Sequence, residues 1–230
     1  MSDSLLSNSS LEIVATKDGS QTVLNKELGS TYHSRHGAFT ESQHVFIGKG
    51  LRKLVDNGVM KITLLEMGFG TGLNALLTFQ AVLGTKVEID YHGLEVNPLP
   101  ASLMKNYTLP EDSVMMARQF EAMHSSSWNE ATAISDQFML TKHQVALQHY
   151  HPNVNFNLVY YDAFEPETQP ELWTIEVFGK LHSWMSQGGI LTTYCCKGYV
   201  KRNMIAAGFE VEKVPGPPGK REMICATKPL

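Results

Sequence analysis

The chain has 230 residues, of which 43% are hydrophobic, enough to bury one substantial core in a single domain. Its formal net charge of −4 argues against a protein that grips nucleic acid over its whole surface, because phosphate contacts require Lys and Arg. Its three cysteines provide neither a disulfide framework nor a zinc-binding spacing, and residues 1–10 lack the apolar stretch of a signal peptide or membrane span. We therefore expect a soluble cytoplasmic protein with no metal and no membrane partner.

The first 58 residues predict a small extension ahead of the main fold. Two short stretches that are candidate strands flank a turn formed by Asp18 and Gly19, which is the pattern of a β-hairpin, and a helical pattern follows. The predicted elements are strands at residues 12–16 and 21–24 and a helix at residues 43–57. We therefore expect an N-terminal extension, residues 1–58, packed on a core domain, residues 59–230.

From residue 59 onward, apolar runs typical of strands alternate with helical patterns. Strands are predicted at residues 61–67, 87–94, 156–162, 189–194 and 221–227, and helices at residues 73–83, 98–107, 170–185 and 197–207. This alternation predicts an α/β protein with a parallel, doubly wound sheet. Residues 112–155 are harder to interpret. Within them, residues 138–141 and 144–147 could pair around a turn at Lys142 and His143.

A glycine-rich loop follows the first core strand, at the edge of a parallel sheet where ligands bind. Gly68, Gly70 and Gly72 lack the Cβ atoms that would block the approach of a ligand. We expect their N–H groups to be free to bind a polar group of a nucleotide-like cofactor. The alternative is a tight connection between strand and helix that binds nothing.

Two acids indicate which cofactor the loop holds. A dinucleotide site requires the spacing GxGxxG, whereas here the spacing is GxGxG and Glu66 precedes it. Glu66 suits the cationic amino group of an aminoacyl cofactor better than a pyrophosphate. Glu95 ends the next strand, where its carboxylate can accept hydrogen bonds from both ribose hydroxyls of an adenosine, although a strand-end Glu can also simply be solvated. Together the two acids favour S-adenosylmethionine over NAD.

A third acid, Asp162, ends another buried strand and is followed by Phe164 and Pro166. Methyl transfer to an amine depends on positioning and on removal of a proton, because an ammonium group has no lone pair. A carboxylate at Asp162 can take that proton. Phe164 could stack on an unpaired base. The alternative is that Asp162 only caps the following turn.

The C-terminal residues 195–230 are basic, with seven Lys and Arg against three Glu. This segment is either a surface that faces RNA or an ordinary solvated face. Four histidines lie close together in pairs, but no acidic or thiolate residues accompany them, so we expect no metal site. These histidines are His33, His36, His149 and His151.

An ordered series of motifs resembles the methyltransferase domain of the MnmC family, the tRNA 5-methylaminomethyl-2-thiouridine biosynthesis proteins, without their FAD-dependent oxidoreductase half. The resemblance covers residues 32–227. The matching pieces are residues 41–46, 66–74, 162–173, 188–193, 198–202, 207–209 and 219–223. Two pieces depart from the family pattern: residues 148–152 contain no acid where the family has a Gly-Asp pair, and a proline-rich loop at residues 215–219 replaces Gly-Phe-Gly.

The resemblance implies a Rossmann-like S-adenosylmethionine-dependent methyltransferase fold with a small N-terminal β-hairpin extension. It implies methylation of the 5-aminomethyl group of a wobble uridine, usually 2-thiolated, in the anticodon region of tRNA, and a partner enzyme that makes the aminomethyl intermediate. By motif match, the residues implied to hold the cofactor are Tyr32, Glu41, Glu66, Gly68, Phe69, Gly70, Gly72, Asn74 and Glu95. Asp162 is implied to be catalytic, and the implied substrate contacts are Phe164, Pro166, Lys220 and Arg221, the last two at tRNA or at the rim of the site.

Two other functions remain open at this point. One is a methyltransferase that acts on a small amine or on protein, which would use the same cofactor site but leave the basic C-terminal segment unexplained. The other is a non-catalytic RNA-binding module on a methyltransferase scaffold, against which the intact loop and the three acids argue.

Overall fold

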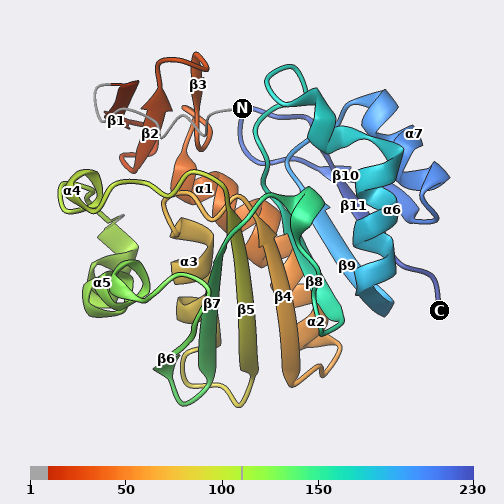
Figure 1. Cartoon of the computed structure of the whole chain (residues 1–230), viewed down its shortest axis with the longest axis horizontal. Helices are drawn as coiled ribbons and strands as arrows, with labels where there is room; N and C mark the ends of the chain where they lie inside the picture. Colours follow the sequence, from red (N-terminus) through yellow and green to blue (C-terminus); the bar gives the residue numbers. More distant parts are fainter. Residues whose placement is uncertain (1–9, 110) are drawn as a thin grey trace.

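An eight-stranded sheet runs through the middle of the computed structural model, which describes residues 10–109 and 111–230 (Figure 1). Its strands are β4 (Lys61–Met67), β5 (Glu88–Glu95), β6 (Ala131–Ser135), β7 (Phe138–Gln144), β8 (Phe156–Tyr161), β9 (Met185–Thr193), β10 (Glu210–Pro215) and β11 (Glu222–Thr227). Their order is β10-β11-β9-β8-β4-β5-β7-β6, and the five strands from β9 to β7 are parallel. The predicted α/β fold with a doubly wound sheet is confirmed.

Helices cover both faces of this sheet. They are α1 (Ala38–Ser42), η2 (Gln43–Leu51), α2 (Arg52–Asp56), α3 (Leu73–Val82), α4 (Ala101–Met104), η3 (Glu111–Met116), α5 (Ala117–Ser125), η4 (Leu147–His149), η5 (Pro170–Trp173), α6 (Ile175–Trp184) and α7 (Gly198–Ala206). The run from α1 to α2 is continuous and packs with α3 on one face, whereas α6 and α7 pack on the other (Figure 1). None of the helices in the described residues is long and apolar enough to cross a membrane.

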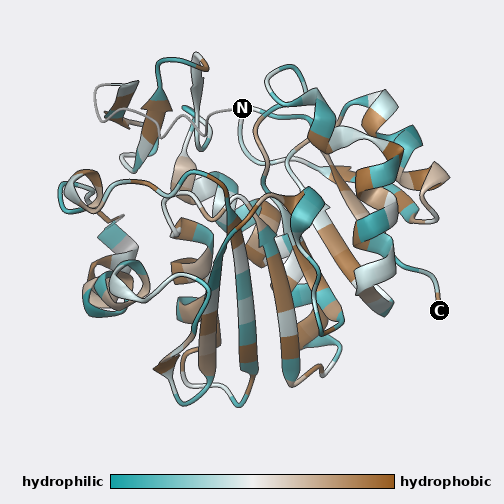
Figure 2. Ribbon diagram, in the orientation of Figure 1, coloured by the Kyte–Doolittle hydropathy of each residue, from teal (hydrophilic) through white to brown (hydrophobic). Residues whose placement is uncertain are grey.

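Successive side chains along each strand point to opposite faces of the sheet, and this divides the hydrophobic core into two clusters. On β4, Leu64 packs with the cluster under η2 and α3, whereas its neighbour Leu65 packs with the cluster under α6 and α7. Both leucines are fully buried, as expected of a central parallel strand covered on two faces. The strand β5 is more open on one side, and Figure 2 shows hydrophilic and hydrophobic bands alternating along it. The burial of β4 explains why its sequence is a nearly continuous apolar run.

The helix η2 approaches the sheet closely because it carries a glycine there. A Cβ atom on Gly50 would lie 3.1 Å from the ring of Tyr160 and 3.2 Å from Leu158. This close approach buries Phe46 and Leu51 against the sheet. The N-terminal segment is thereby fixed to the core beside β8 and β9.

The N-terminal hairpin lies above the carboxyl edge of the sheet (Figure 1). Its strands are β1 (Leu11–Ala15) and β2 (Gln21–Asn25), which pair antiparallel, and the short β3 (Ser30–Thr31) joins β2. At the turn, Asp18 accepts hydrogen bonds from the N–H of Ser20 at 3.0 Å and the N–H of Thr40 at 2.9 Å. The predicted hairpin extension is confirmed, and Asp18 ties it to α1.

The predicted turn at Lys142 and His143 is wrong. Residues 138–144 form one strand, β7, which runs parallel to β5, and its hairpin partner is β6. Lys142 is buried, with Nζ 4.9 Å from the centre of the Trp128 ring and 3.1 Å from the carbonyl oxygen of His124. Its charge therefore has partners inside the fold, which the sequence pattern did not reveal.

Three further elements differ from the sequence prediction. The helix predicted at residues 98–107 shrinks to α4, and the one predicted at 170–185 divides into η5 and α6 at Thr174. The Thr174 side chain caps α6 by accepting a hydrogen bond from the N–H of Val177 at 3.3 Å. The strand β10 was not predicted, because all six of its residues are exposed or only half-buried in the polar pattern of an edge strand.

Candidate functional site

A cavity of about 280 Å³ opens at the carboxyl ends of β4, β5 and β8, beneath the N-terminal hairpin. The strand order reverses here, since β5 lies on one side of β4 and β8 on the other. This is the position at which doubly wound sheets bind ligands. The cavity is lined by residues that include Tyr32, His33, Gly68, Gly70, Glu95 and Asp162.

The glycine loop provides space rather than free donors. Gly68 has φ +86°, and a Cβ atom on it would lie 2.8 Å from the carbonyl oxygen of Asp162. A Cβ atom on Gly70, with φ +50°, would lie 2.9 Å from the ring of Tyr32. Both positions therefore require glycine.

The N–H groups of this loop are not free, contrary to the expectation from the sequence. The N–H of Gly68 donates to the carbonyl oxygen of Leu94 at 3.1 Å, and that of Gly70 donates to Oε2 of Glu95 at 3.0 Å. The N–H of Gly72 donates a hydrogen bond to the carbonyl oxygen of Phe69 at 2.8 Å. The end of β5 therefore satisfies the Gly68 and Gly70 donors, and the loop itself satisfies the Gly72 donor.

A buried polar cluster lies below the cavity. Nδ2 of Asn74 donates to Oε1 of Glu66 at 2.9 Å and to Oδ2 of Asp162 at 2.8 Å, so one amide joins two carboxyl groups. Oε2 of Glu66 has no hydrogen-bond partner among the described residues, and the side chain is fully buried. Burial raises the pKa of Glu66 well above its usual value. Neither Glu66 nor Asn74 lines the cavity itself.

Asp162 does line the cavity, and its side chain is only 6% exposed. Burial raises its pKa to about 8, with the nearby charge of Glu41 adding to the effect and Asn74 and Lys220 opposing it. A carboxyl group with such a pKa gains and loses a proton near neutral pH, as a general base must.

Glu95 lies on the opposite wall of the cavity. Its Oε1 accepts a hydrogen bond from the N–H of Asn97 at 2.9 Å, and its Oε2 accepts one from the N–H of Gly70. These backbone donors orient both carboxylate oxygens, and burial raises the pKa of the group. Each oxygen keeps a second lone pair with which it could accept a hydrogen bond from a hydroxyl group.

Two aromatic rings from different parts of the chain meet at the cavity. Tyr32, at the end of the N-terminal hairpin, contacts Phe164 edge to face with ring centres 5.1 Å apart, and both rings line the cavity. Pro166 is buried. The predicted residues Tyr32, Gly68, Gly70, Glu95, Asp162 and Phe164 therefore come together.

Phe69 lies elsewhere. Its ring is 3% exposed and lines a second cavity of about 700 Å³ on the other side of the glycine loop, with Trp128, Phe120 and Lys142. A Cβ atom on Gly93 would lie 2.7 Å from Phe69, so this ring packs directly on β5. Its position makes Phe69 a support for the loop rather than a wall of the first cavity.

Glu41 and Lys220 join the two ends of the chain beside the site. Nζ of Lys220 lies 2.9 Å from Oε1 of Glu41 and 4.2 Å from the centre of the Tyr194 ring. The hydroxyl of Tyr194 donates to the carbonyl oxygen of Ala163 at 2.7 Å. Glu41 is 6% exposed and does not line the cavity. Lys220 therefore contacts Glu41 and Tyr194 beside the site, and it does not line the cavity.

This ion pair leads to a prediction about stability. We expect Lys220→Met to lower the free energy of unfolding by about 1–3 kcal/mol, because it leaves the buried Glu41 carboxylate without its ammonium partner. Denaturant unfolding monitored by circular dichroism measures this loss. The matched control is Lys213→Met, which breaks an exposed pair with Glu222 of similar length and should change stability little. Equal losses in the two variants would contradict a structural role for Lys220.

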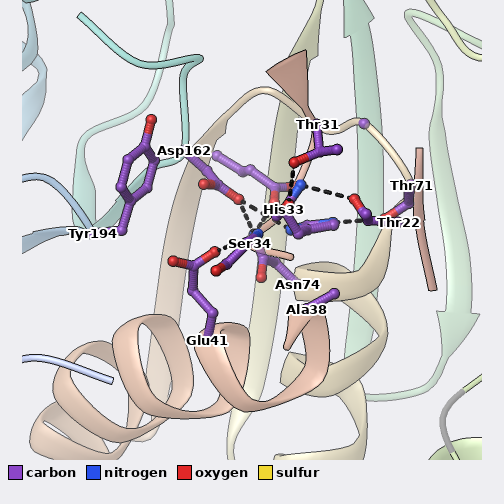
Figure 3. Close-up of polar contacts among 12 residues, drawn as sticks. Thr22, Thr31, His33, Ser34, Ala38, Glu41, Thr71, Asn74, Asp162 and Tyr194 are labelled. Atoms are coloured by element: carbon purple, nitrogen blue, oxygen red, sulfur yellow. Dashed lines mark hydrogen bonds and ion pairs between the residues drawn. The ribbon is translucent and has the colours of Figure 1, made fainter. Parts of the chain in front are cut away.

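Two residues of the site were not predicted as such from the sequence. His33 lines the cavity beside Asp162, and in the view of Figure 3 Tyr194 lies on the other side of Asp162, with its hydroxyl donating to Ala163 of the cavity wall. The sequence offered one clue to His33, which is its position directly after Tyr32, and none to Tyr194. Among the residues that the structure describes, no three His, Cys, Asp or Glu side chains gather in a group able to hold a metal ion.

The basic C-terminal segment is largely used within the protein. Lys197 pairs with Glu167, Lys213 with Glu222 and Lys220 with Glu41, while Nζ of Lys228 donates to two carbonyl groups at 2.8 Å. Three other basic residues of this segment make neither an ion pair nor a side-chain hydrogen bond with the residues that the structure describes. They are Lys201, Arg202 and Arg221.

Comparison with known proteins adds to this geometry. A family model described as S-adenosyl-L-methionine-dependent methyltransferase matches residues 118–229. This part of the chain is therefore similar to S-adenosylmethionine-dependent methyltransferases. The chain is also similar to proteins named tRNA 5-methylaminomethyl-2-thiouridine biosynthesis bifunctional protein MnmC: 29% identical over 220 residues in Pseudomonas aeruginosa and 30% over 224 residues in Aromatoleum aromaticum. These matches cover 89% and 90% of the chain but only 33% and 34% of the relatives, so the chain spans about a third of their length.

A solved structure shows the same fold. The crystal structure of MNMC2 from Aquifex aeolicus aligns with 94% of this chain and 70% of its own chain, with a TM-score of 0.79 and 24% identity. The predicted Rossmann-like methyltransferase fold is thereby confirmed.

The site fits S-adenosylmethionine, the cofactor named in the description of the matching family model. The unpartnered Oε2 of Glu66 can accept a hydrogen bond from a cationic amino group. The space above Gly68 and Gly70, which a Cβ atom would fill, leaves room for the cofactor backbone. Glu95 presents oriented oxygens where an adenosine ribose would lie.

Proposed function

We propose that the chain transfers a methyl group from S-adenosylmethionine to the 5-aminomethyl group of a wobble uridine in tRNA. The product would be 5-methylaminomethyluridine, with or without a 2-thio group. The observation that carries the proposal is the buried Asp162 carboxyl group, which lines the cavity next to the glycine loop. The relatives that align with 89–90% of the chain are named for the biosynthesis of this nucleoside, which supports the proposal.

The acceptor must lose a proton before it can react. An aminomethyl group is mostly an ammonium ion near neutral pH, and its lone pair becomes available only after deprotonation. Asp162, whose pKa burial raises to about 8, can take this proton at low energetic cost. When bound, S-adenosylmethionine supplies the electrophilic methyl group, and the remaining task of the protein is to hold the amine in line with it.

The cofactor contacts follow from the positions of the acids. We propose that Glu66 and its partner Asn74 bind the amino group of S-adenosylmethionine. We propose that Glu95 binds the ribose hydroxyls of the cofactor. Gly68 and Gly70 allow close approach, and Gly72 lets the chain turn into α3 with φ +71°. Tyr32 covers the cavity from the hairpin.

The acceptor nucleoside would bind at the aromatic rings of Tyr32 and Phe164. Phe164 and Tyr32 could enclose a uracil base that has been turned out of the anticodon loop, as aromatic side chains do for unpaired bases. Lys201, Arg202 and Arg221 would then contact tRNA phosphates, while Lys220 supports the rim. A cytoplasmic location and a partner enzyme that supplies the 5-aminomethyl group follow from this substrate.

A labelling experiment tests the proposal. The protein is incubated with methyl-labelled S-adenosylmethionine and with unmodified, 5-aminomethyl or 5-carboxymethylaminomethyl tRNA. We expect label only in the 5-aminomethyl tRNA. Equal labelling of unmodified tRNA would overturn the substrate, labelling of a free amine or protein alone would favour the broader amine methyltransferase, and no labelling would favour a non-catalytic module.

A further inference from the structure

His33 lies between the glycine loop and Asp162, in the cluster drawn in Figure 3. Its Nε2 is 2.8 Å from Oγ1 of Thr71, which belongs to the glycine loop. Its Nδ1 is 3.9 Å from Oδ2 of Asp162, and the two side chains are 7% and 6% exposed. One imidazole ring therefore joins the loop at the end of β4 to the carboxyl group at the end of β8.

The backbone around this ring is held on both sides. The N–H of His33 donates to Oγ1 of Thr22 at 2.9 Å, and its carbonyl oxygen accepts the hydroxyl of Thr31 at 2.7 Å. The next N–H, of Ser34, donates to Oε2 of Glu41 at 2.9 Å. The hairpin and α1 thus fix the orientation in which His33 meets Asp162.

The imidazole is neutral at physiological pH. Burial lowers the pKa of His33 to about 4, against an opposing effect of Glu41. A neutral imidazole has one N–H donor and one acceptor nitrogen. If the Thr71 hydroxyl donates to Nε2, the proton is on Nδ1 and faces Asp162. The other ionisable groups around Asp162 are Glu41, Glu66, Tyr91, Lys220 and Tyr194.

Two donors approach the same oxygen of Asp162. Nδ2 of Asn74 is 2.8 Å from Oδ2, and Nδ1 of His33 approaches that atom from the hairpin side. The other oxygen, Oδ1, is left for the acceptor amine. A separation of 3.9 Å is longer than a hydrogen bond, and such contacts commonly shorten when substrate binds.

We propose that His33 is a positioning residue for Asp162: Thr71 holds its ring through Nε2, and Nδ1–H supports Oδ2 so that Oδ1 faces the amine. This inference rests on the proposed role of Asp162 as the base of the methyl transfer. It gives the N-terminal hairpin a part in the chemistry, because that segment supplies the group that orients the base.

Three substitutions separate the two ring nitrogens. In His33→Asn the amide nitrogen can occupy the place of Nδ1, whereas in His33→Gln it can occupy the place of Nε2. His33→Phe fills the same space and removes both contacts. If Nδ1 is the atom that matters, Asn should restore what Phe removes, and Gln should not.

The first readout needs neither cofactor nor tRNA. The chain has seven aspartates, and carbon-13 labelling of their carboxyl groups lets NMR follow each titration, with Asp162→Asn identifying the signal. In the wild type we expect Asp162 to titrate near pH 8. Loss of a donor to the carboxylate raises its pKa, so the midpoint should rise by about half a unit or more in the Phe and Gln variants and stay near the wild-type value in Asn.

The second readout is methyl transfer to 5-aminomethyl tRNA. We expect His33→Phe to lower kcat by roughly 10-fold and to move the rise of kcat with pH to higher pH, with KM for S-adenosylmethionine within several-fold and recovery in His33→Asn. An unchanged Asp162 midpoint in all three variants, or equal recovery by Asn and Gln, would overturn the inference. If no tRNA is methylated by the wild type but the midpoints shift as expected, the acceptor is wrong and the positioning role remains.

Discussion

Replacing Asp162 with asparagine should lower kcat for methyl transfer by roughly 100-fold or more, while cofactor affinity stays within several-fold. Asparagine keeps the shape of the side chain and can still contact Asn74, but it cannot take a proton from the acceptor. The substitution therefore separates proton removal from binding. Single-turnover methyl transfer and equilibrium binding of S-adenosylmethionine measure the two quantities.

The pH dependence sharpens this prediction. The active form is the carboxylate, so kcat in the wild type should rise with pH through about 8, where Asp162 loses its proton, and then level off. In Asp162→Asn this rise should disappear from the residual rate.

The stability of this variant provides the control. The carboxylate is costly to bury, because its pKa in the folded protein is raised above the unfolded value of 3.8. Asp162 therefore destabilises the fold progressively as pH rises from about 4 to 8, and Asp162→Asn should unfold at the same temperature as the wild type or higher at pH 8. A lower unfolding temperature, or a loss of cofactor affinity equal to the loss of rate, would make Asp162 a structural or binding residue.

Substituting Gly68 by alanine should weaken binding of S-adenosylmethionine by roughly 10-fold or more. The residue has φ +86°, and the added Cβ atom would lie 2.8 Å from the carbonyl oxygen of Asp162, which must then move away from the loop. Because this oxygen belongs to backbone, no side-chain rotation relieves the contact. Isothermal titration calorimetry with the cofactor measures the effect.

The matched control for this prediction is Gly84→Ala. Gly84 has a similar φ of +73°, but a Cβ atom on it would meet nothing within 4 Å. Both variants carry the same backbone strain, which is about 1–2 kcal/mol for a left-handed residue, so both should be less stable. Only Gly68→Ala should lose cofactor affinity. An equal loss of affinity in the two variants would show that it results from lower stability of the fold rather than from the added Cβ atom at the site.

The positions of the three acids followed from local sequence alone. Glu66, Glu95 and Asp162 each lie at or directly beside the carboxyl end of a predicted strand, and the carboxyl ends of parallel strands share one edge of the sheet. The same reasoning placed the glycine loop, since its spacing suits close approach by a ligand. What it missed was the fate of the loop N–H groups, which the end of β5 satisfies.

Contacts between distant segments could not be read in this way. The course of β7 through Lys142 depends on Trp128 and His124, which bury the charge, and no local pattern records them. The pair of Glu41 and Lys220 joins residues 179 positions apart. In both cases a charged residue that looks solvent-exposed in the sequence has a partner supplied by the fold.

The sequence by itself determined the α/β fold, the glycine loop and the three acids at strand ends, because these depend on periodicity and on neighbours along the chain. Only the tertiary structure decided how the acids are coupled. Asn74 joins Glu66 to Asp162, and His33 reaches Asp162 from the N-terminal hairpin. The raised pKa of Asp162 arises from burial beneath that hairpin, and burial is a property of the assembled fold rather than of any segment.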